Sequence, residues 1–344
     1  MPTAAETPLV TIDDIRQAAE RLQGIIVRTP LLPLEGPLPA DPARPRPYLK
    51  AESLQPIGAF KLRGAYNAIA TMPAERRAAG VVTHSSGNHA QGVARAARLF
   101  GIRAVVVMPT DAPRVKVEAV RADGAEIVFV GPSNAERVTR AHTISQDEEL
   151  ALVPSFDDPA IIAGQGTAGL EIVEQVAELD RLGADPGLPA PAGLTVLVPV
   201  GGGGLAAGVA TAVKELRPDA RVFGVEPFLA ADAQASLRQG RVVRWPPEAV
   251  GRTSADGMRT EALGLLPFRQ LRRYLDGVIA VEEVEIARAM ARAASLARLV
   301  LEPSGATSLA AWLFHAYELG AEGRVVALLS GGNVDPDLFQ RLAG

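Results

Sequence analysis

Short apolar runs alternate with helical stretches along most of the chain. Runs rich in Val, Ile and Leu, such as 102–109 (IRAVVVMP), predict buried strands. Between them, segments such as 88–100 and 113–123 place apolar residues three and four positions apart, which predicts amphipathic helices. Strands separated by helices of this length form βαβ units with parallel strands. The predicted strands are 80–86, 102–109, 125–131, 195–200, 221–227, 276–282 and 324–330.

These strands fall into two series, one before and one after the middle of the chain. We therefore expect an α/β fold of two open, twisted, mostly parallel sheets flanked by helices, with the ligand near the strands' carboxyl ends. Residues 11–14 (TIDD) open an amphipathic run and predict a capped helix. The Pro- and Gly-rich stretches 39–48 and 182–194 predict surface loops.

Composition excludes several classes of protein. The 344 residues allow two domains or one large α/β unit, and a net charge of −4 argues against a nucleic-acid partner. No apolar run is long enough to span a membrane, and the N-terminus does not resemble a signal peptide. The chain has no cysteine, which excludes disulfides, thiol catalysis and cysteine zinc sites and fits a cytoplasmic location.

A glycine loop marks the first candidate site. Residues 195–216 predict a buried strand, four consecutive glycines (Gly201 to Gly204) and then a helix. Backbone amides in such a loop can converge on an anion, and the helix adds its positive N-terminal end. The pattern therefore predicts a phosphate-binding loop, but it does not identify whose phosphate.

Two alternatives to this interpretation stay open at this point. Gly202, Gly204 and Ala207 fit the dinucleotide pattern G-x-G-x-x-G/A, and Glu226 ends the next strand about 20 residues further on. The loop could also be a tight strand-to-helix turn without a ligand. A Walker-type loop is excluded because no Gly-Lys-Ser/Thr follows.

Other polar groups distinguish between these possibilities. Lys61 lies in a glycine-flanked segment, 58–64 (GAFKLRG), and two strands end in polar loops, 83–92 (THSSGNHAQG) and 328–335 (LLSGGNVD). A dehydrogenase gives no role to this lysine or to these loops. A lysine, a phosphate-binding loop and neutral hydrogen-bond donors together favour pyridoxal phosphate over NAD.

The order of motifs along the chain carries a family resemblance. The motifs are SLQPIGAFKLRGA, THSSGNHAQGVA, SFDDPAIIAGQGTAGLEI, PVGGGGLAAG, GVEP, ADGMRT, EPSGA and LSGGNVD. With them the chain resembles fold-type II pyridoxal-phosphate enzymes (the tryptophan-synthase-β-like fold), specifically the threonine/serine dehydratase and serine racemase group.

The resemblance implies a domain organisation. It implies a large cofactor-binding domain of residues 1–80 and 156–344, a small mobile domain of residues 81–155, and a cofactor between them. It also implies a homodimer. The chain ends soon after the last motif, so we expect no C-terminal regulatory domain.

The resemblance also assigns the cofactor contacts. Lys61 becomes the Schiff-base lysine, and Phe60 packs near the ring. Asn88 bonds the ring hydroxyl, and Ser330 faces the pyridine nitrogen. The phosphate is assigned to Gly201, Gly202, Gly203, Gly204 and the backbone of Leu205.

Substrate contacts follow from the same resemblance. Ser85, Asn88 and His89 are expected to hold the substrate's α-carboxylate. Ser86 is either a proton donor and acceptor on the face opposite Lys61, as in similar racemases, or a carboxylate ligand or helix cap. Arg137 either pairs with a second substrate carboxylate or is a solvated helix arginine.

A metal site is implied away from the chemistry. Glu226, the backbone of Ala230 and Asp232 match a divalent-cation site of the family, and such oxygen ligands suit Mg²⁺ or Ca²⁺. Without the resemblance these residues would be a strand-end acid and a helix cap. His142 and His315 lie on predicted helices without a partner spacing, and we expect both to be structural.

The expected activity is that of an ammonia-lyase. It would convert L-threonine or L-serine, small β-hydroxy amino acids, to a 2-oxo acid and ammonia by α-proton abstraction and β-hydroxyl elimination. A serine racemase and a threo-3-hydroxyaspartate dehydratase on the same scaffold are the nearest alternatives. A Rossmann-type NAD oxidoreductase is the alternative from a different class.

Overall fold

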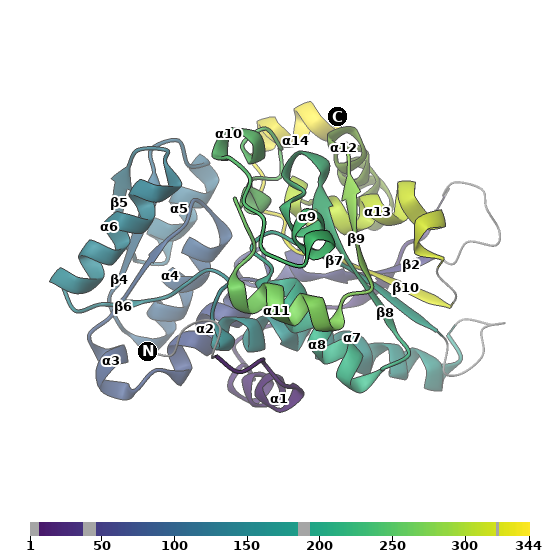
Figure 1. Ribbon diagram of the computed structural model, residues 1–344, viewed down its shortest axis with the longest axis horizontal. Helices are drawn as coiled ribbons and strands as arrows, with labels where there is room; N and C mark the ends of the chain where they lie inside the picture. The colour runs from purple at the N-terminus through teal and green to yellow at the C-terminus, as the bar shows by residue number, and fades with distance from the viewer. Residues whose placement is uncertain (1–6, 37–45, 185–192, 321–322) are drawn as a thin grey trace.

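Two sheets form the framework of the protein (Figure 1). The computed structural model describes residues 7–36, 46–184, 193–320 and 323–344. The larger sheet has the order β1 (Leu31–Pro33), β2 (Pro47–Ala51), β10 (Arg324–Leu329), β7 (Leu194–Pro199), β8 (Arg221–Pro227), β9 (Gly277–Val281). The smaller sheet has the order β5 (Glu126–Val130), β4 (Ala104–Pro109), β3 (Val81–His84), β6 (Ala151–Leu152).

The predicted α/β architecture is confirmed. Each of the seven predicted strands is present, and the strands pair in parallel except for β1 with β2. Three short strands, β1, β2 and β6, were not predicted. The loop predicted at 39–48 is wrong at its end, because Pro47 and Tyr48 begin β2, while residues 39–45 lie outside the described part of the chain. The other loop was predicted at 182–194. Its first residue, Leu182, still belongs to a helix, its last, Leu194, begins β7, and residues 185–192 lie outside the described part of the chain.

Helices cover both faces of the larger sheet, and β7 shows how the sequence directs this. Val196 and Val198 lie in one core cluster with helices α1, α7, α8 and α11, whereas Leu197 lies in the other with α12 and α13. Side chains of a strand alternate between faces, so a continuous apolar run predicts a strand buried on both sides. The helices are α1 (Ile12–Arg21), α7 (Pro159–Leu182), α8 (Gly204–Leu216), α9 (Asp232–Gln239), α10 (Pro247–Val250), α11 (Leu265–Tyr274), α12 (Glu283–Arg292), α13 (Pro303–Leu319) and α14 (Pro336–Ala343).

Local sequence explains where several helices begin. Thr11 caps α1 as predicted, accepting from the backbone of Asp14, whose side chain in turn accepts from the backbone of Thr11. Asp158 caps α7 and Pro159 occupies its first turn, where a missing N–H costs nothing. No helix of the described residues is long and apolar enough to cross a membrane.

The smaller sheet is covered by α4 (Asn88–Phe100) and α5 (Arg114–Ala122) on one face and by α6 (Asn134–Asp147) on the other. Its strands all lie within residues 81–155, the segment expected to form the small domain. Its core also includes residues outside that segment: Leu62 and Ile69 of α2 (Leu62–Thr71) and Ile161 of α7. The short α3 (Ala74–Ala78) joins α2 to β3. The domain boundaries at 80 and 155 stay a prediction.

Candidate active site

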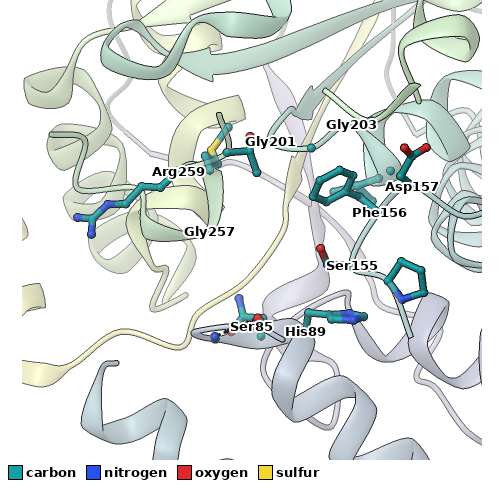
Figure 2. A pocket seen from close by; sticks show the side chains of 18 of the residues that line it. Ser85, His89, Ser155, Phe156, Asp157, Gly201, Gly203, Gly257 and Arg259 are labelled. Atoms are coloured by element: carbon teal, nitrogen blue, oxygen red, sulfur yellow. Dashed lines mark hydrogen bonds between the residues drawn. The ribbon is translucent and has the colours of Figure 1, made fainter. Parts of the chain in front are cut away.

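A cavity of about 760 Å³ lies where the carboxyl ends of strands from both sheets meet. Figure 2 shows Ser85 and His89 on one side of this cavity and Gly201, Gly203 and Phe156 on the opposite side. Parallel strands bring their carboxyl ends to one edge, which explains why residues far apart in the sequence converge here. The cavity wall includes all the predicted cofactor and substrate residues: Phe60, Lys61, Ser85, Ser86, Asn88, His89, Arg137, Gly201, Gly202, Gly203, Gly204, Leu205 and Ser330.

Lys61 is held at the first turn of α2 without an acidic partner. Its Nζ donates to the carbonyl of Ser155 at 2.9 Å and lies 5.2 Å from the centre of the Phe60 ring. Burial lowers the pKa of Lys61 to about 8. At neutral pH a far larger fraction of this amine is therefore unprotonated, and nucleophilic, than for an exposed lysine.

Glycines shape the backbone around this lysine. Gly58 has a φ of 70°, which turns the chain just before Phe60. A Cβ at Gly64 would collide with the side chain of Gln165, whose Oε1 accepts from the Gly64 backbone N–H at 3.2 Å. The glycine-flanked segment is thus explained by close approach of its backbone to a neighbouring helix.

The four-glycine loop forms a tight turn before α8 whose geometry suits an anion. Gly203 has a φ of 93° and precedes α8, and no side chain caps that helix. A Cβ at Gly202 would collide with the ring of Phe156, so only glycine leaves the backbone against this ring. The uncapped amides at the start of α8 belong to residues that line the cavity, where an anion would also meet the positive end of the helix.

A second uncapped helix start lies across the cavity. Gly87 precedes α4, no side chain caps that helix, and the Gly87 N–H donates to Ser85 Oγ at 3.2 Å. The alternative that Ser86 caps the helix is therefore not observed. Free backbone N–H groups at this helix start suit a substrate carboxylate.

His89 has a more specific environment than the sequence indicated. Its ring Nε2 lies 3.2 Å from the carbonyl of Val153, so Nε2 carries the proton and donates. Burial and the nearby Lys61 hold the pKa of His89 well below its usual value, so the ring is neutral. His89 can thus contribute its backbone N–H to a carboxylate, but not an imidazolium charge.

Arg137 lies in the cavity wall on the smaller-sheet side, together with His84 and His142. It is half-buried, its Nη2 donates to Asn134 Oδ1 at 3.3 Å, and its Nε is buried without a hydrogen-bond partner. Burial, Arg137 and His142 lower the pKa of His84 to about 4. Arg137 is therefore less exposed than its helix neighbour Arg140, and its role in binding a second carboxylate stays a prediction.

Two histidines were expected to be structural, and the structure separates them. His142 lies in the cavity wall, which helical periodicity alone did not reveal, and its structural role stays a prediction. His315 instead lies against Glu285 and Glu318 at 2.9 Å each, away from the cavity.

Comparison with known proteins places the chain in a family. The family described as "Pyridoxal-phosphate dependent enzyme" matches residues 22–331. The chain belongs to this family. It is 39% identical to an L-threonine ammonia-lyase of Thermotoga maritima over 97% of this chain and 78% of that protein. It is 38% identical to an L-threo-3-hydroxyaspartate ammonia-lyase of a Pseudomonas species over 97% of this chain and 98% of that protein.

A solved structure of similar shape agrees with the fold. Maize serine racemase superposes with a TM-score of 0.86 at 34% identity and covers 97% of both chains. The two sheets flanked by helices are therefore those of the fold-type II pyridoxal-phosphate enzymes. The Rossmann NAD oxidoreductase, the alternative from a different class, is overturned by the family match.

The residues present fit the cofactor of this pyridoxal-phosphate-dependent family. A buried lysine without a carboxylate partner and an uncapped glycine turn line the same cavity. An amine of lowered pKa can bond an aldehyde carbon, and the glycine turn can hold a phosphate. Lys61 would therefore carry pyridoxal phosphate, with Gly201 to Gly204 at its phosphate end.

Several residues of the cavity were not predicted from the sequence. Gln165 is buried, and its Nε2 has no hydrogen-bond partner. A polar residue between two glycines in an apolar helical run (IIAGQGTAG) was the available signal. Lys116, Asp256 and Glu302 also line the cavity; Asp256 lies in the motif ADGMRT and Glu302 in EPSGA, just before a helix-starting proline, but no role was assigned to any of the three.

The predicted metal residues form a buried acidic pair outside the cavity. Glu226 accepts from the backbone of Ala233 and Gln234, at 3.0 and 2.7 Å, and Asp232 Oδ2 has no hydrogen-bond partner. Burial raises the pKa of Asp232 to about 7, and burial together with Asp232 raises the pKa of Glu226 well above its usual value. Among the described residues there is no cluster of three or more acidic or histidine side chains that could hold a metal. An ion there would need the Ala230 carbonyl or water besides the two carboxylates.

Proposed function

We propose that the chain is a pyridoxal-phosphate-dependent ammonia-lyase of small β-hydroxy amino acids, with L-threonine or L-serine as the leading substrates. The observation that carries the proposal is Lys61, whose pKa is lowered to about 8, in a cavity with two uncapped helix starts. One helix start suits the cofactor's phosphate and the other the substrate's α-carboxylate. The similar ammonia-lyases support the reaction type.

The chain's own residues account for positioning and proton transfer. The cofactor, when bound, supplies an electron sink that acidifies the substrate's α-carbon. The start of α4 holds the substrate carboxylate through backbone N–H groups near Ser85, Asn88 and His89, and the unprotonated Lys61 amine accepts the α-proton. Ser330, which the family resemblance assigns to the pyridine nitrogen, lies in the cavity wall; a hydroxyl at that place, unlike a carboxylate, would not hold a proton on the nitrogen.

The activity is tested by 2-oxo acid release from L-threonine, L-serine and L-threo-3-hydroxyaspartate, measured in parallel with added pyridoxal phosphate and Mg²⁺. Turnover of threonine or serine supports the proposal. Turnover of none of the three by protein that visibly holds the cofactor contradicts it. Chiral analysis of serine in the same reactions tests racemisation, for which Ser86 is the proposed proton donor and acceptor.

The position of Arg137 favours a second candidate substrate, 3-hydroxyaspartate. We expect Arg137→Gln to lower kcat/KM for L-threo-3-hydroxyaspartate about 10- to 100-fold, since a charge-assisted pair contributes about 1.5–3 kcal/mol. The value for L-threonine should change less than about twofold, because threonine has no second carboxylate.

Arg140→Gln is the matched control, since Arg140 is an exposed arginine on the same helix outside the cavity wall. It should leave both substrates unaffected. Equal losses for threonine and hydroxyaspartate in Arg137→Gln would show that Arg137 supports the fold of the cavity and does not select the substrate.

We also propose a divalent cation, Mg²⁺ or Ca²⁺, at Glu226, Ala230 and Asp232. The buried acidic pair, with one oxygen lacking a partner, supports this. At about 100 times its dissociation constant a cation bound only to the folded state adds about 2.7 kcal/mol of stability. Thermal unfolding should therefore shift upward by several degrees with Mg²⁺ or Ca²⁺, and Asp232→Asn should lose the shift.

The exposed Asp219, paired with Arg217 at 3.0 Å, offers the control Asp219→Asn, which should keep the shift. If neither cation changes the melting temperature of the unmodified protein, the site does not bind metal. The homodimer implied by the family likewise stays a proposal, which a solution molecular mass would test.

A further inference from the structure

One charged side chain crosses the cavity between the two sheets. Lys116 on α5 is buried, and its Nζ lies 2.5 Å from Asp256 Oδ2 and 3.0 Å from Glu302 Oε2. Asp256 begins the 3₁₀ turn Asp256–Met258, and Glu302 immediately precedes α13. Among the ion pairs of the described residues, only these two connect the segment 81–155 with the rest of the chain.

The charges of this cluster depend on one another. Burial alone would lower the pKa of Lys116, but Glu302 and Asp256 together raise it above its usual value. Burial and the nearby Asp256 raise the pKa of Glu302 above its usual value, and Lys116 opposes that rise. Lys116 therefore stays charged, and it favours the ionised form of Glu302.

The second oxygen of Glu302 reaches the cofactor-binding wall. Glu302 Oε1 accepts from Asn88 Nδ2 at 2.5 Å, and Asn88 Oδ1 accepts from Asn333 Nδ2 at 2.9 Å. Asn333 Nδ2 also donates to the carbonyl of Ile57 at 2.8 Å, which fixes the orientation of that amide. Since Asn88 Oδ1 already accepts from Asn333, the NH₂ group of Asn88 is the side that faces Glu302. One N–H of that group remains available to the cavity.

Lys116 also supports the loop that precedes α4. A Cβ at Gly87 would lie 2.9 Å from Lys116 Cδ, so the lysine's alkyl chain packs directly on this glycine. The same side chain thus contacts the predicted carboxylate-binding loop and holds the acid that orients Asn88.

We propose that Lys116 and Glu302 are positioning residues for the cofactor. Lys116 pairs with Glu302 and fixes its position, Glu302 orients the Asn88 amide, and Asn88 donates to the ring oxygen of pyridoxal phosphate. The pair of Lys116 with Asp256 holds the two halves of the cavity at the spacing that this chain of contacts needs. The inference rests on the proposed place of the cofactor, but not on which amino acid is the substrate.

The test measures the bound cofactor directly, in the holoenzyme variants Lys116→Met and Glu302→Gln. Loss of one well-oriented hydrogen bond should raise the cofactor's dissociation constant about 10-fold. The pH midpoint of its visible absorption band should rise, because a donated hydrogen bond stabilises the deprotonated ring oxygen. Lys214→Met, which removes a lysine paired with Asp276 at 2.9 Å outside the cavity, should change neither quantity.

The double variant Lys116→Met/Glu302→Gln distinguishes positioning from general support of the fold. If Lys116 acts through Glu302, the double variant should raise the dissociation constant little more than the larger of the two single variants does. If the two residues act independently, their fold-changes in the dissociation constant should multiply. Multiplicative effects, or an unchanged band and affinity in the near-isosteric Glu302→Gln, would overturn the proposal. Because no substrate is used, these outcomes are separate from failure of the ammonia-lyase activity, which the release of 2-oxo acid tests.

Discussion

Replacing Lys61 with alanine should abolish covalent retention of pyridoxal phosphate and lower kcat for threonine or serine by at least about 10²–10⁴-fold. The structure gives the reason: Lys61 is the cavity lysine that lacks an acidic partner, whereas Lys50 and Lys116 are each held by a glutamate. The chain has only four lysines, so attachment of the cofactor to a lysine other than Lys61 would be readily recognised. Borohydride reduction followed by peptide mass spectrometry measures the attachment.

Reduction of the unmodified protein should add the cofactor's mass to the peptide containing Lys61 and to no other. Lys214→Ala is the control, and it should keep both the label and the activity. Label on Lys50, Lys116 or Lys214 in the unmodified protein would contradict the assignment, and so would full activity of Lys61→Ala.

The lowered pKa of Lys61 has a consequence that can be measured against pH. Attachment requires the unprotonated amine, and burial places the pKa of Lys61 at about 8. The rate of cofactor attachment to the cofactor-free protein should therefore rise with pH and level off above about 8. A free lysine derivative in the same buffers should continue to rise toward its ordinary pKa of about 10.4. Identical profiles for the two amines would show that burial does not activate Lys61.

The sequence predicted the long strands but not the short ones, for a physical reason. Buried parallel strands such as β7 are continuous apolar runs, and their pattern is visible without the rest of the chain. The strand β2 (PYLKA) is fully buried too, yet it contains Lys50, which breaks that pattern. Glu171, 121 residues away, compensates this charge, and no local signal reveals such a partner.

The residues of the candidate site likewise separate into those that the sequence predicts and those that it does not. Residues at strand ends, such as Ser85 and the glycines from Gly201, were predictable because parallel strands bring their carboxyl ends together. Gln165 and Glu302 lie at positions whose importance comes from contacts more than 100 residues distant, with Gly64 and Asn88 respectively. His142 could not be placed because the weakly apolar α6 does not reveal which face meets the cavity.

A buried network of charges next to Lys61 gives the largest expected effect on stability. Arg63, two residues after Lys61, is completely buried and donates to both oxygens of Glu52 and both oxygens of Glu171. Lys50 donates to Glu171 Oε2 at 2.5 Å in the same cluster. Arg63→Met should lower the free energy of unfolding by about 3–5 kcal/mol, because it leaves buried carboxylates without their cation. Urea denaturation measures this loss.

The surface arginine Arg103 provides a matched control. It also binds two glutamates, Glu126 at 2.6 Å and Glu148 at 2.7 Å, but its side chain is 43% exposed. Arg103→Met should cost less than about 1 kcal/mol, because solvent screens exposed ion pairs. Equal losses of unfolding free energy in Arg63→Met and Arg103→Met would show that burial does not increase the contribution of the network to stability.

The pH dependence of the Arg63→Met variant separates loss of charge compensation from loss of packing. Burial alone would raise the pKa of Glu52, but Arg63 holds this pKa below its usual value in the native protein. Glu52 thus stabilises the unmodified protein above its unfolded pKa of about 4.3, and this contribution is lost as pH falls further. Without Arg63, burial should instead raise the pKa of Glu52, so its ionisation opposes folding at neutral pH. The deficit of Arg63→Met should therefore be largest near pH 7 and shrink as pH falls toward 4, whereas a packing defect would be independent of pH.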